Sequence, residues 1–227
     1  MINNKQEFTE KFKYIMNRMF PNTNQNFTFS NFDKYINNPE LDKIGIYVIK
    51  PKKSYILEVI DYPEGPTEYR GQKISEIKKY KNIKATSTKL RESDKEILYI
   101  GATPSKYKSE TLKGRLTKYR NFGYGYQEDN DHSGGKRIWF IKNNKDNLVI
   151  DYMNIDLLQQ RFPLLCKKAE NMKNKYPHED NLTGYIEDSL LYLHKFAYKR
   201  YPFANERCDY KETENEWLCF WTDYKIN

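Results

Sequence analysis

The sequence predicts an α+β fold in which helices flank a small, mainly antiparallel central sheet. Short apolar runs with the length of strands, such as residues 44–49, are separated along the chain by longer segments of helical periodicity. The clearest helical segment, residues 183–198, carries its apolar side chains on one face. The 227 residues show no internal repeat and no long linker, so we expect residues 1–227 to form one domain.

The first expected element is an amphipathic helix over residues 5–20, placed before the sheet as an extra N-terminal helix. Pro21 ends it, because proline cannot continue a helix. Residues 21–40 are polar and rich in Asn, which predicts a loop. These segments together make an N-terminal helical extension of residues 1–43. The apolar residues at helical spacing are Phe8, Phe12, Ile15, Met16 and Met19.

Two buried strands are expected at residues 44–49 and 97–100. Residues 50–95 form a long insertion between them, with twelve Lys or Arg against seven Asp or Glu. Loop-closure entropy grows slowly with loop length, so such an insertion still allows the two strands to pair. Within the insertion we expect a continuation or partner of the first strand over residues 55–60, a short helix over 73–80 and a charged loop over 81–95.

A helix is predicted from Ser109 onward, since Leu112, Leu116 and Tyr119 follow one another at spacings of four and three. The glycines at positions 123 and 125 would end it. Two further strands are expected over residues 137–142 and 148–153, joined by the turn-rich NNKDN. Residues 155–175 should be helical with an interruption at Pro163, and a helix over 183–198 has Thr183 as its N-cap. The C-terminal tail, 206–227, should dock on the domain through its Trp217–Trp221 region.

The charge of the chain favours a polyanionic partner. The formal net charge is +8, which suits nucleic acid, although generic basicity is the alternative. Residues 102–125 concentrate the positive charge against one acid, Glu110, and interleave it with aromatic side chains suited to base stacking. The basic residues of this segment are Lys106, Lys108, Lys113, Arg115, Lys118 and Arg120.

Cysteine use and hydropathy indicate the compartment. The three cysteines and three histidines form no zinc-binding pattern, and a sparse, odd number of cysteines is typical of a reducing cytoplasm. The sequence MINNKQEF lacks the apolar core of a secretion signal, and no apolar run has membrane-spanning length. We therefore expect a cytoplasmic protein with no membrane partner.

Two triplets mark the predicted strands: Gly45-Ile46-Tyr47 in the first and Tyr99-Ile100-Gly101 in the second. They are followed in order by Arg115 in a helix, Glu187 in a helix, and Asn205 at the end of PFAN. From about residue 44 to 206 this arrangement resembles the GIY-YIG endonuclease family. Residues 132–141, HSGGKRIWFI, together with PFAN resemble most its type II restriction-enzyme branch.

The resemblance implies a role for each of these residues. Tyr47 would help to deprotonate the attacking water, Tyr99 would support it by hydrogen bonding, and Arg115 would bind the phosphate. Glu187 would hold one Mg²⁺ (or Mn²⁺) ion, and Asn205 would brace the site by orienting Glu187 or a metal-bound water. Tyr119 stands where the family often has His or Tyr, four residues after Arg115.

Elementary chemistry agrees with these roles. Phosphodiester hydrolysis needs an activated water, neutralisation of the phosphoryl charge and help to the leaving group. Antiparallel pairing can bring Tyr47 and Tyr99 to one face of the sheet, and a neighbouring cation favours the phenolate. Arg115 can bind phosphate through its planar fork, and one carboxylate is sufficient protein ligation for a largely hydrated Mg²⁺.

Each of these residues also has a purely structural interpretation. Tyr47, Tyr99 and Tyr119 can be core aromatics, and Arg115 can be a solvated helix residue. Glu187 can be a carboxylate that reaches solvent from the edge of the core, and Asn205 can be a turn residue after Pro202. The insertion can be a solvated decoration instead of an arm around DNA. His132 is more simply a loop residue, and the spacing from Glu187 to Asn205 is long for the family.

The function expected is therefore a metal-dependent DNA endonuclease, specifically a type II restriction endonuclease that cuts double-stranded DNA, with a homodimer on a palindromic site. The alternatives are a repair, phage or homing nuclease of the same family, or an inactive DNA-binding module. Glu76-Ile77-Lys78 with Asp61 could belong to another nuclease fold, but no strand is expected there. The expected DNA contacts are Lys106, Lys108, Lys113, Lys118, Arg120 and Arg137.

Overall fold

The computed structural model describes residues 4–21, 27–53, 55–60, 68–69, 72–73, 96–103, 110–124, 135–176, 182–205 and 211–226. Their arrangement is α+β, as the sequence predicts, with a small antiparallel sheet and several helices. Of the helix expected at 73–80 only Lys73 is described, and it belongs to a strand; residues 74–80, the loop expected at 81–95, Lys106, Lys108 and His132 lie outside the described residues.

The central sheet has three strands in the order β4-β1-β5. β1 (Gly45–Pro51) lies in the middle and pairs antiparallel with both β4 (Tyr99–Ala102) and β5 (Leu148–Asn154). The two strands that carry the triplets are therefore direct neighbours, although residues 50–95 separate them in the sequence. Part of that insertion forms a separate two-stranded pair, β2 (Glu68–Tyr69) with β3 (Gln72–Lys73).

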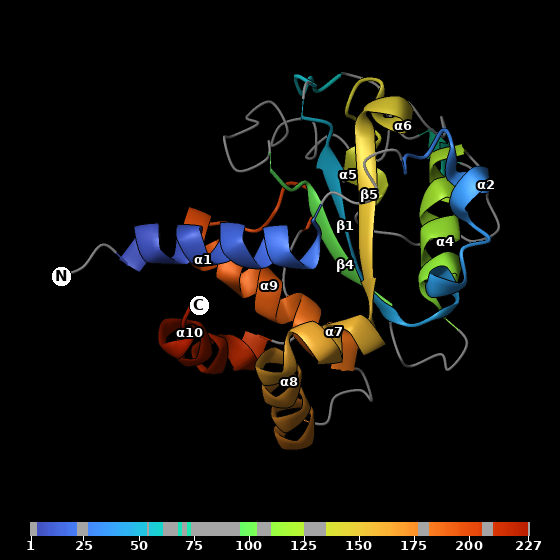
Figure 1. Cartoon of the computed structure of the whole chain (residues 1–227). Helices are drawn as coiled ribbons and strands as arrows, with labels where there is room; N and C mark the ends of the chain where they lie inside the picture. Colours follow the sequence, from blue (N-terminus) through green and yellow to red (C-terminus); the bar gives the residue numbers. More distant parts are fainter. Residues whose placement is uncertain are drawn as a thin grey trace.

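One face of the sheet is covered by α1 (Asn4–Met19) and α9 (Leu182–Tyr198), and Figure 1 shows these two helices crossing the same side. Ile46 and Val48 point from β1 into this core. The same core continues beneath helices that follow β5 and end the chain. These are α7 (Ile155–Arg161), α8 (Pro163–Lys175) and α10 (Glu214–Asp223).

The other face is covered by α4 (Leu112–Tyr124), and Figure 1 shows α2 (Phe32–Tyr35) beside it. Tyr47 and Ile49, which alternate with the residues of the first core, belong to this second core. Short segments complete it. These are the 3₁₀ turn η1 (Pro39–Asp42) and the helices α5 (Gly135–Ile138) and α6 (Asn144–Asn147).

The long periodic helices are confirmed. All five apolar residues predicted for the first helix are buried in α1. The break at Pro163 separates α7 from α8, and Pro163 is accommodated as the first residue of α8. Trp217 and Trp221 of α10 are fully buried, so the tail docks as expected. Within the tail, η4 (Lys211–Thr213) directly precedes α10.

Two predictions in the N-terminal half are wrong. Residues 21–40 are not simply loop, because Phe32 and Leu41 anchor α2 and η1 in the second core. Residues 55–60 are neither part of β1 nor its partner. Instead Ile60 donates a backbone hydrogen bond to Phe140 (2.9 Å), and Glu58 accepts one from Lys142 (3.0 Å).

Two predictions in the C-terminal half are also wrong. Residues 137–142 are not a strand, because four consecutive side chains from Ile138 to Ile141 are buried, and a turn through the core buries all four where a one-faced strand would bury alternate ones. Thr183 is not an N-cap, since α9 begins at Leu182 and the Thr183 hydroxyl donates to the Thr103 carbonyl (2.7 Å). None of the described helices is long and apolar enough to cross a membrane.

Candidate active site

The pairing of β1 with β4 brings the two signature tyrosines together. Tyr47 is opposite Gly101 and Ile49 is opposite Tyr99, so both tyrosines project to the same face of the sheet. Their ring centroids are 5.8 Å apart, and their side chains are hydrogen-bonded to each other. Both tyrosines are almost completely buried.

The glycines of the two triplets are required by close packing. A Cβ on Gly101 would lie 2.6 Å from Cζ and 2.7 Å from the hydroxyl oxygen of Tyr47, and 2.6 Å from the ring of Tyr99. A Cβ on Gly45 would lie 2.3 Å from the Met153 carbonyl oxygen on β5. Glycine at these positions lets the tyrosine rings and the neighbouring strand lie directly on the backbone.

Helix α4 supplies Arg115. The buried Leu112 and Leu116 fix the helix on the sheet, and the backbone N–H of Leu112 donates to the Lys43 carbonyl (2.9 Å) just before β1. This attachment turns the Arg115 guanidinium towards Tyr47, with which it forms a hydrogen bond. Arg115 Nε is buried and has no hydrogen-bond partner among the described residues, whereas the side chain as a whole is 24% exposed.

Tyr119, one turn further along α4, is fully buried. Its ring stacks on Phe29 with centroids 5.2 Å apart and lies 5.8 Å from the ring of Tyr99. These contacts support the core-packing interpretation of Tyr119, and they also make it the support of the Tyr99 ring.

Glu187 comes from α9, which packs mainly on the opposite face of the sheet. The start of this helix is tied to the sheet by the Thr183–Thr103 hydrogen bond, and Thr103 Oγ1 in turn accepts from the Gly45 N–H (2.9 Å). Among almost entirely buried neighbours Glu187 is only partly buried. It is close enough to act electrostatically on Tyr47, Tyr99 and Arg115, so helices from both faces contribute to the site.

Asn205 is engaged by backbone groups. Its Oδ1 accepts from the Ile100 N–H (3.0 Å) and its Nδ2 donates to the Ile100 carbonyl (2.8 Å). The neighbouring Ala204 N–H donates to the Leu98 carbonyl (2.8 Å). The amide therefore completes the outer edge of β4, next to Tyr99. This arrangement fixes the amide to the backbone of β4.

Burial dominates the ionisation of the tyrosines. It raises the pKa of Tyr47 well above the usual value; Arg115 acts to lower that pKa and Glu187 to raise it. The pKa of Tyr99 is likewise raised by burial and by the charges of Tyr47 and Glu187. Desolvation acts to lower the pKa of Arg115, but the neighbouring phenols and carboxylates outweigh it and raise that pKa. At neutral pH the phenols are protonated and Arg115 is charged, so this cation alone does not produce a phenolate.

The donor set limits how a metal ion could be held. The described residues contain no group of three or more His, Cys, Asp or Glu side chains arranged around a metal position. Glu187 is the carboxylate predicted as the ligand, and it adjoins the phenols and Arg115. One carboxylate fits a Mg²⁺ ion whose other ligands are water and phosphate oxygens.

All four predicted DNA contacts that the structure describes have protein partners. Lys113 lies 3.9 Å from Asp42, Lys118 lies 2.8 Å from Glu110, and Arg120 pairs with Asp33. The guanidinium of Arg120 also lies 4.9 Å from the centroid of the Phe32 ring, which fastens α2 to α4.

Arg137 donates to the Phe203 carbonyl (3.1 Å), within the turn that carries Asn205. Lys113 and Lys118 remain partly exposed on α4, with exposed side-chain fractions of 38% and 43%. They are therefore the better placed of these four cations to meet DNA.

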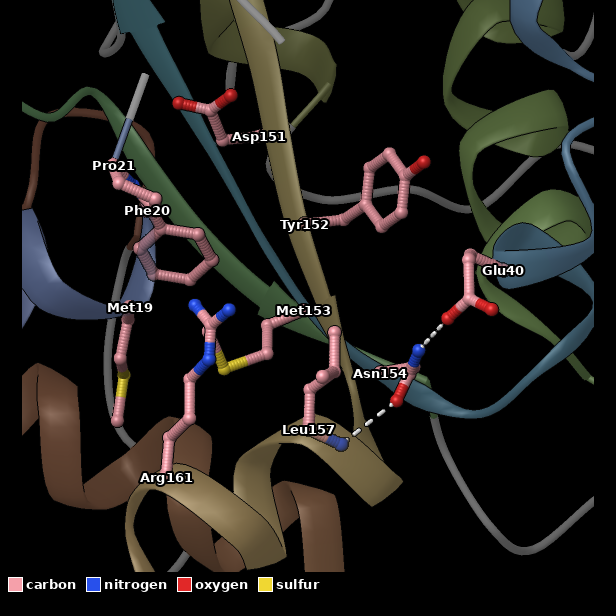
Figure 2. Close-up of a pocket in the computed structure, with 10 residues that line it drawn as sticks. All are labelled: Met19, Phe20, Pro21, Glu40, Asp151, Tyr152, Met153, Asn154, Leu157 and Arg161. Atoms are coloured by element: carbon pink, nitrogen blue, oxygen red, sulfur yellow. Dashed lines mark hydrogen bonds between the residues drawn. The ribbon is translucent and has the colours of Figure 1, made fainter. Parts of the chain in front are cut away.

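A separate cavity of about 200 Å³ lies along β5, with Leu157 and Arg161 of α7 at one side, as Figure 2 shows. None of the predicted site residues lines it. Its buried acid, Asp151, is paired with Lys50, and Asn154 accepts from the Leu157 N–H (3.0 Å). The tyrosine site and this cavity are therefore two different features of the molecule.

Comparison with protein-family models, with characterised proteins and with solved structures finds no match to this chain. The arrangement of Tyr47, Tyr99, Arg115 and Glu187 is thus the main argument about function.

Proposed function

We propose that the protein is a metal-dependent DNA endonuclease of the GIY-YIG type that hydrolyses phosphodiester bonds in double-stranded DNA. The observation that carries the proposal is the gathering of Tyr47, Tyr99, Arg115 and Glu187, from four separate elements, around one pair of hydrogen-bonded phenols. Residues placed only for packing would not require a charged arginine and a carboxylate beside two buried tyrosines.

Each residue has a task that its surroundings support. Arg115 is charged and its side chain is 24% exposed, so its guanidinium binds a phosphoryl oxygen. The Tyr47 hydroxyl donates a hydrogen bond to the attacking water or accepts one from it, and the hydrogen bond with Tyr99 orients the Tyr47 hydroxyl. A Mg²⁺ ion, when bound, supplies charge neutralisation and lowers the pKa of bound water, with Glu187 as its protein ligand.

A narrower proposal is a type II restriction endonuclease. Its support is the resemblance of residues 132–141, HSGGKRIWFI, together with PFAN, to that branch of the family, and the basic character of the insertion between β1 and β4. A homodimer on DNA would then place two sites on the two strands. Sedimentation of the protein as a monomer on its specific DNA would contradict this part.

The test is digestion of plasmid and genomic DNA from diverse sources by purified protein with Mg²⁺. Discrete fragments, with ends that share one sequence on sequencing, are the result expected for a restriction enzyme. Nicking without sequence preference would favour a repair, phage or homing nuclease. DNA binding without any cleavage, by protein that is folded, would reject the endonuclease in favour of a binding module.

A further inference from the structure

One acidic side chain is buried in the most basic part of the chain. Glu110 is the only acid within residues 102–125, and its side chain is 6% exposed. Burial of a carboxylate is unfavourable unless cations and hydrogen bonds compensate for the lost hydration. Beside a phosphate-binding arginine, the same negative charge also repels the substrate. A neutral side chain would avoid both costs, so the carboxylate must contribute through its contacts.

Those contacts bring two cations to one oxygen atom. Glu110 Oε1 accepts a hydrogen bond from Lys118 Nζ at 2.8 Å and lies 4.0 Å from Arg115 Nη1. Residues 115 and 118 are three positions apart and therefore share a face of α4. The Arg115 guanidinium is also hydrogen-bonded to Tyr47. The guanidinium thus contacts both the carboxylate and the reacting phenol.

The segment that carries Glu110 is itself fixed. The next residue, Thr111, accepts the Gly114 N–H at its hydroxyl oxygen (3.2 Å) and the Arg115 N–H at its carbonyl (2.9 Å). Leu112 then donates to the Lys43 carbonyl at the entrance to β1. The carboxylate is therefore attached both to the first turn of α4 and to the strand that bears Tyr47.

We propose that Glu110 is a positioning residue that holds the Arg115 guanidinium against Tyr47, and that Lys118, gathered round the same oxygen, is the second cation of that phosphate site. This inference rests on the proposed endonuclease function. The competing explanation is that Glu110 only stabilises the N-terminus of α4 through its charge. Such a role would affect stability and leave the turnover of the folded enzyme unchanged.

The first experiment measures single-turnover cleavage at saturating DNA, together with DNA affinity, for Glu110→Gln. We expect the rate to fall roughly 10- to 100-fold, as for other residues that orient a functional group, while DNA binds as tightly or more tightly because a negative charge is removed. Glu110→Asp should recover part of the rate. Full activity of folded Glu110→Gln would overturn the proposal.

A double substitution tests whether Glu110 acts through Arg115. Because the positioning role of Glu110 acts through Arg115, Glu110→Gln in an Arg115→Lys background should add little further loss. A further loss as large as the one in the natural background would overturn the proposal. The matched control is Glu214→Gln, which breaks the 2.6 Å pair of Glu214 with Lys195 at the start of α10 and should leave cleavage unchanged.

An independent readout does not need activity. In ¹⁵N-detected NMR, a held guanidinium gives separate Nη signals, and a freely rotating one gives an averaged signal; Arg115→Lys assigns them. We expect separate Arg115 signals in the natural protein and in Glu214→Gln, and averaging in Glu110→Gln. Unchanged signals in Glu110→Gln would overturn the positioning role. If the natural protein cleaves no DNA, the endonuclease proposal fails, and these spectra still decide the role of Glu110.

Discussion

The ring of Tyr47 lies directly on the backbone of Gly101, its partner across the β1–β4 ladder. Gly101 of the second triplet thus provides the space in which the ring of Tyr47, from the first triplet, packs. This relationship explains why the two triplets have to occur together, since a side chain at 101 would occupy the space of the Tyr47 hydroxyl, 2.7 Å from the position of a Cβ.

Gly101→Ala should therefore displace both signature tyrosines. We expect a loss of about 1–3 kcal/mol in the free energy of unfolding, typical of overpacking, together with loss of cleavage. The control is Gly114→Ala in α4, where the nearest atoms to an added Cβ are 3.9 and 4.0 Å away. That substitution should stabilise the helix by about 0.5–1 kcal/mol. Denaturant titration measures both, and an equally stable, active Gly101→Ala would contradict this packing.

Glu187→Gln should abolish Mg²⁺-dependent cleavage and leave DNA binding nearly unchanged. The substitution keeps the shape of the side chain and removes the charge that a hard cation requires. Cleavage of labelled DNA across a Mg²⁺ titration, with a gel-shift assay at fixed salt, measures the two effects. Normal cleavage by this variant would show that the metal ligand is another residue.

Tyr47→Phe should lower the cleavage rate by a factor on the order of 10²–10⁴, the usual contribution of a general base. Burial raises the pKa of Tyr47 above its usual value, so the phenolate fraction is small at neutral pH and grows tenfold for each pH unit. If the phenolate is the base, the rate of the natural protein rises continuously with pH beyond about pH 9. A plateau at lower pH that Tyr47→Phe does not alter would exclude this role.

We expect Asn205→Ala to lower the stability of the protein and not to act directly on the chemical step. It leaves the buried N–H and carbonyl of Ile100 without the hydrogen bonds of 3.0 and 2.8 Å that the amide provides. The expected loss is roughly 2–6 kcal/mol in the free energy of unfolding, since each of the two unsatisfied groups costs about 1–3 kcal/mol. Thermal and urea unfolding test this. An undiminished stability combined with complete loss of cleavage would instead indicate a direct chemical role.

His194 predicts a pH dependence of stability. It is fully buried in α9, and its Nδ1 lies 2.6 Å from the Arg200 carbonyl oxygen. Burial lowers the pKa of His194 to about 4 from its usual 6.5. The unfolded chain takes up a proton near pH 6.5 and the folded protein only near pH 4, so stability falls as the pH drops through this interval.

The contribution of His194 amounts to roughly 3 kcal/mol across the interval, since each pKa unit corresponds to about 1.36 kcal/mol. Urea unfolding at several pH values measures it against His194→Gln, which cannot titrate. The stability difference between the two proteins should shrink as the pH falls from 7 to 4. A constant difference would mean that the imidazole titrates alike in both states.

The sequence by itself identified features that depend on neighbours along the chain. The spacing of Phe8, Phe12 and Ile15 specified α1, and that of Ile186, Leu190 and Leu193 specified α9, because one face of a helix is defined by local periodicity. The two triplets and the interruption at Pro163 could also be identified from the sequence. In contrast, residues 137–142 have strand-like composition but form α5 and a turn, because a core that surrounds four consecutive side chains overrides the propensity of the segment.

The tertiary structure alone decided how these pieces meet. The pairing of Tyr47 with Gly101 across the insertion, the use of the Asn205 amide by the backbone of Ile100, and the position of Glu110 beside Arg115 are contacts between distant or differently oriented segments. The ionisation of Tyr47 belongs to the same class, since its pKa depends on burial by both flanking elements. Composition determines which side chains are available, whereas their desolvation and their partners are properties of the packed molecule.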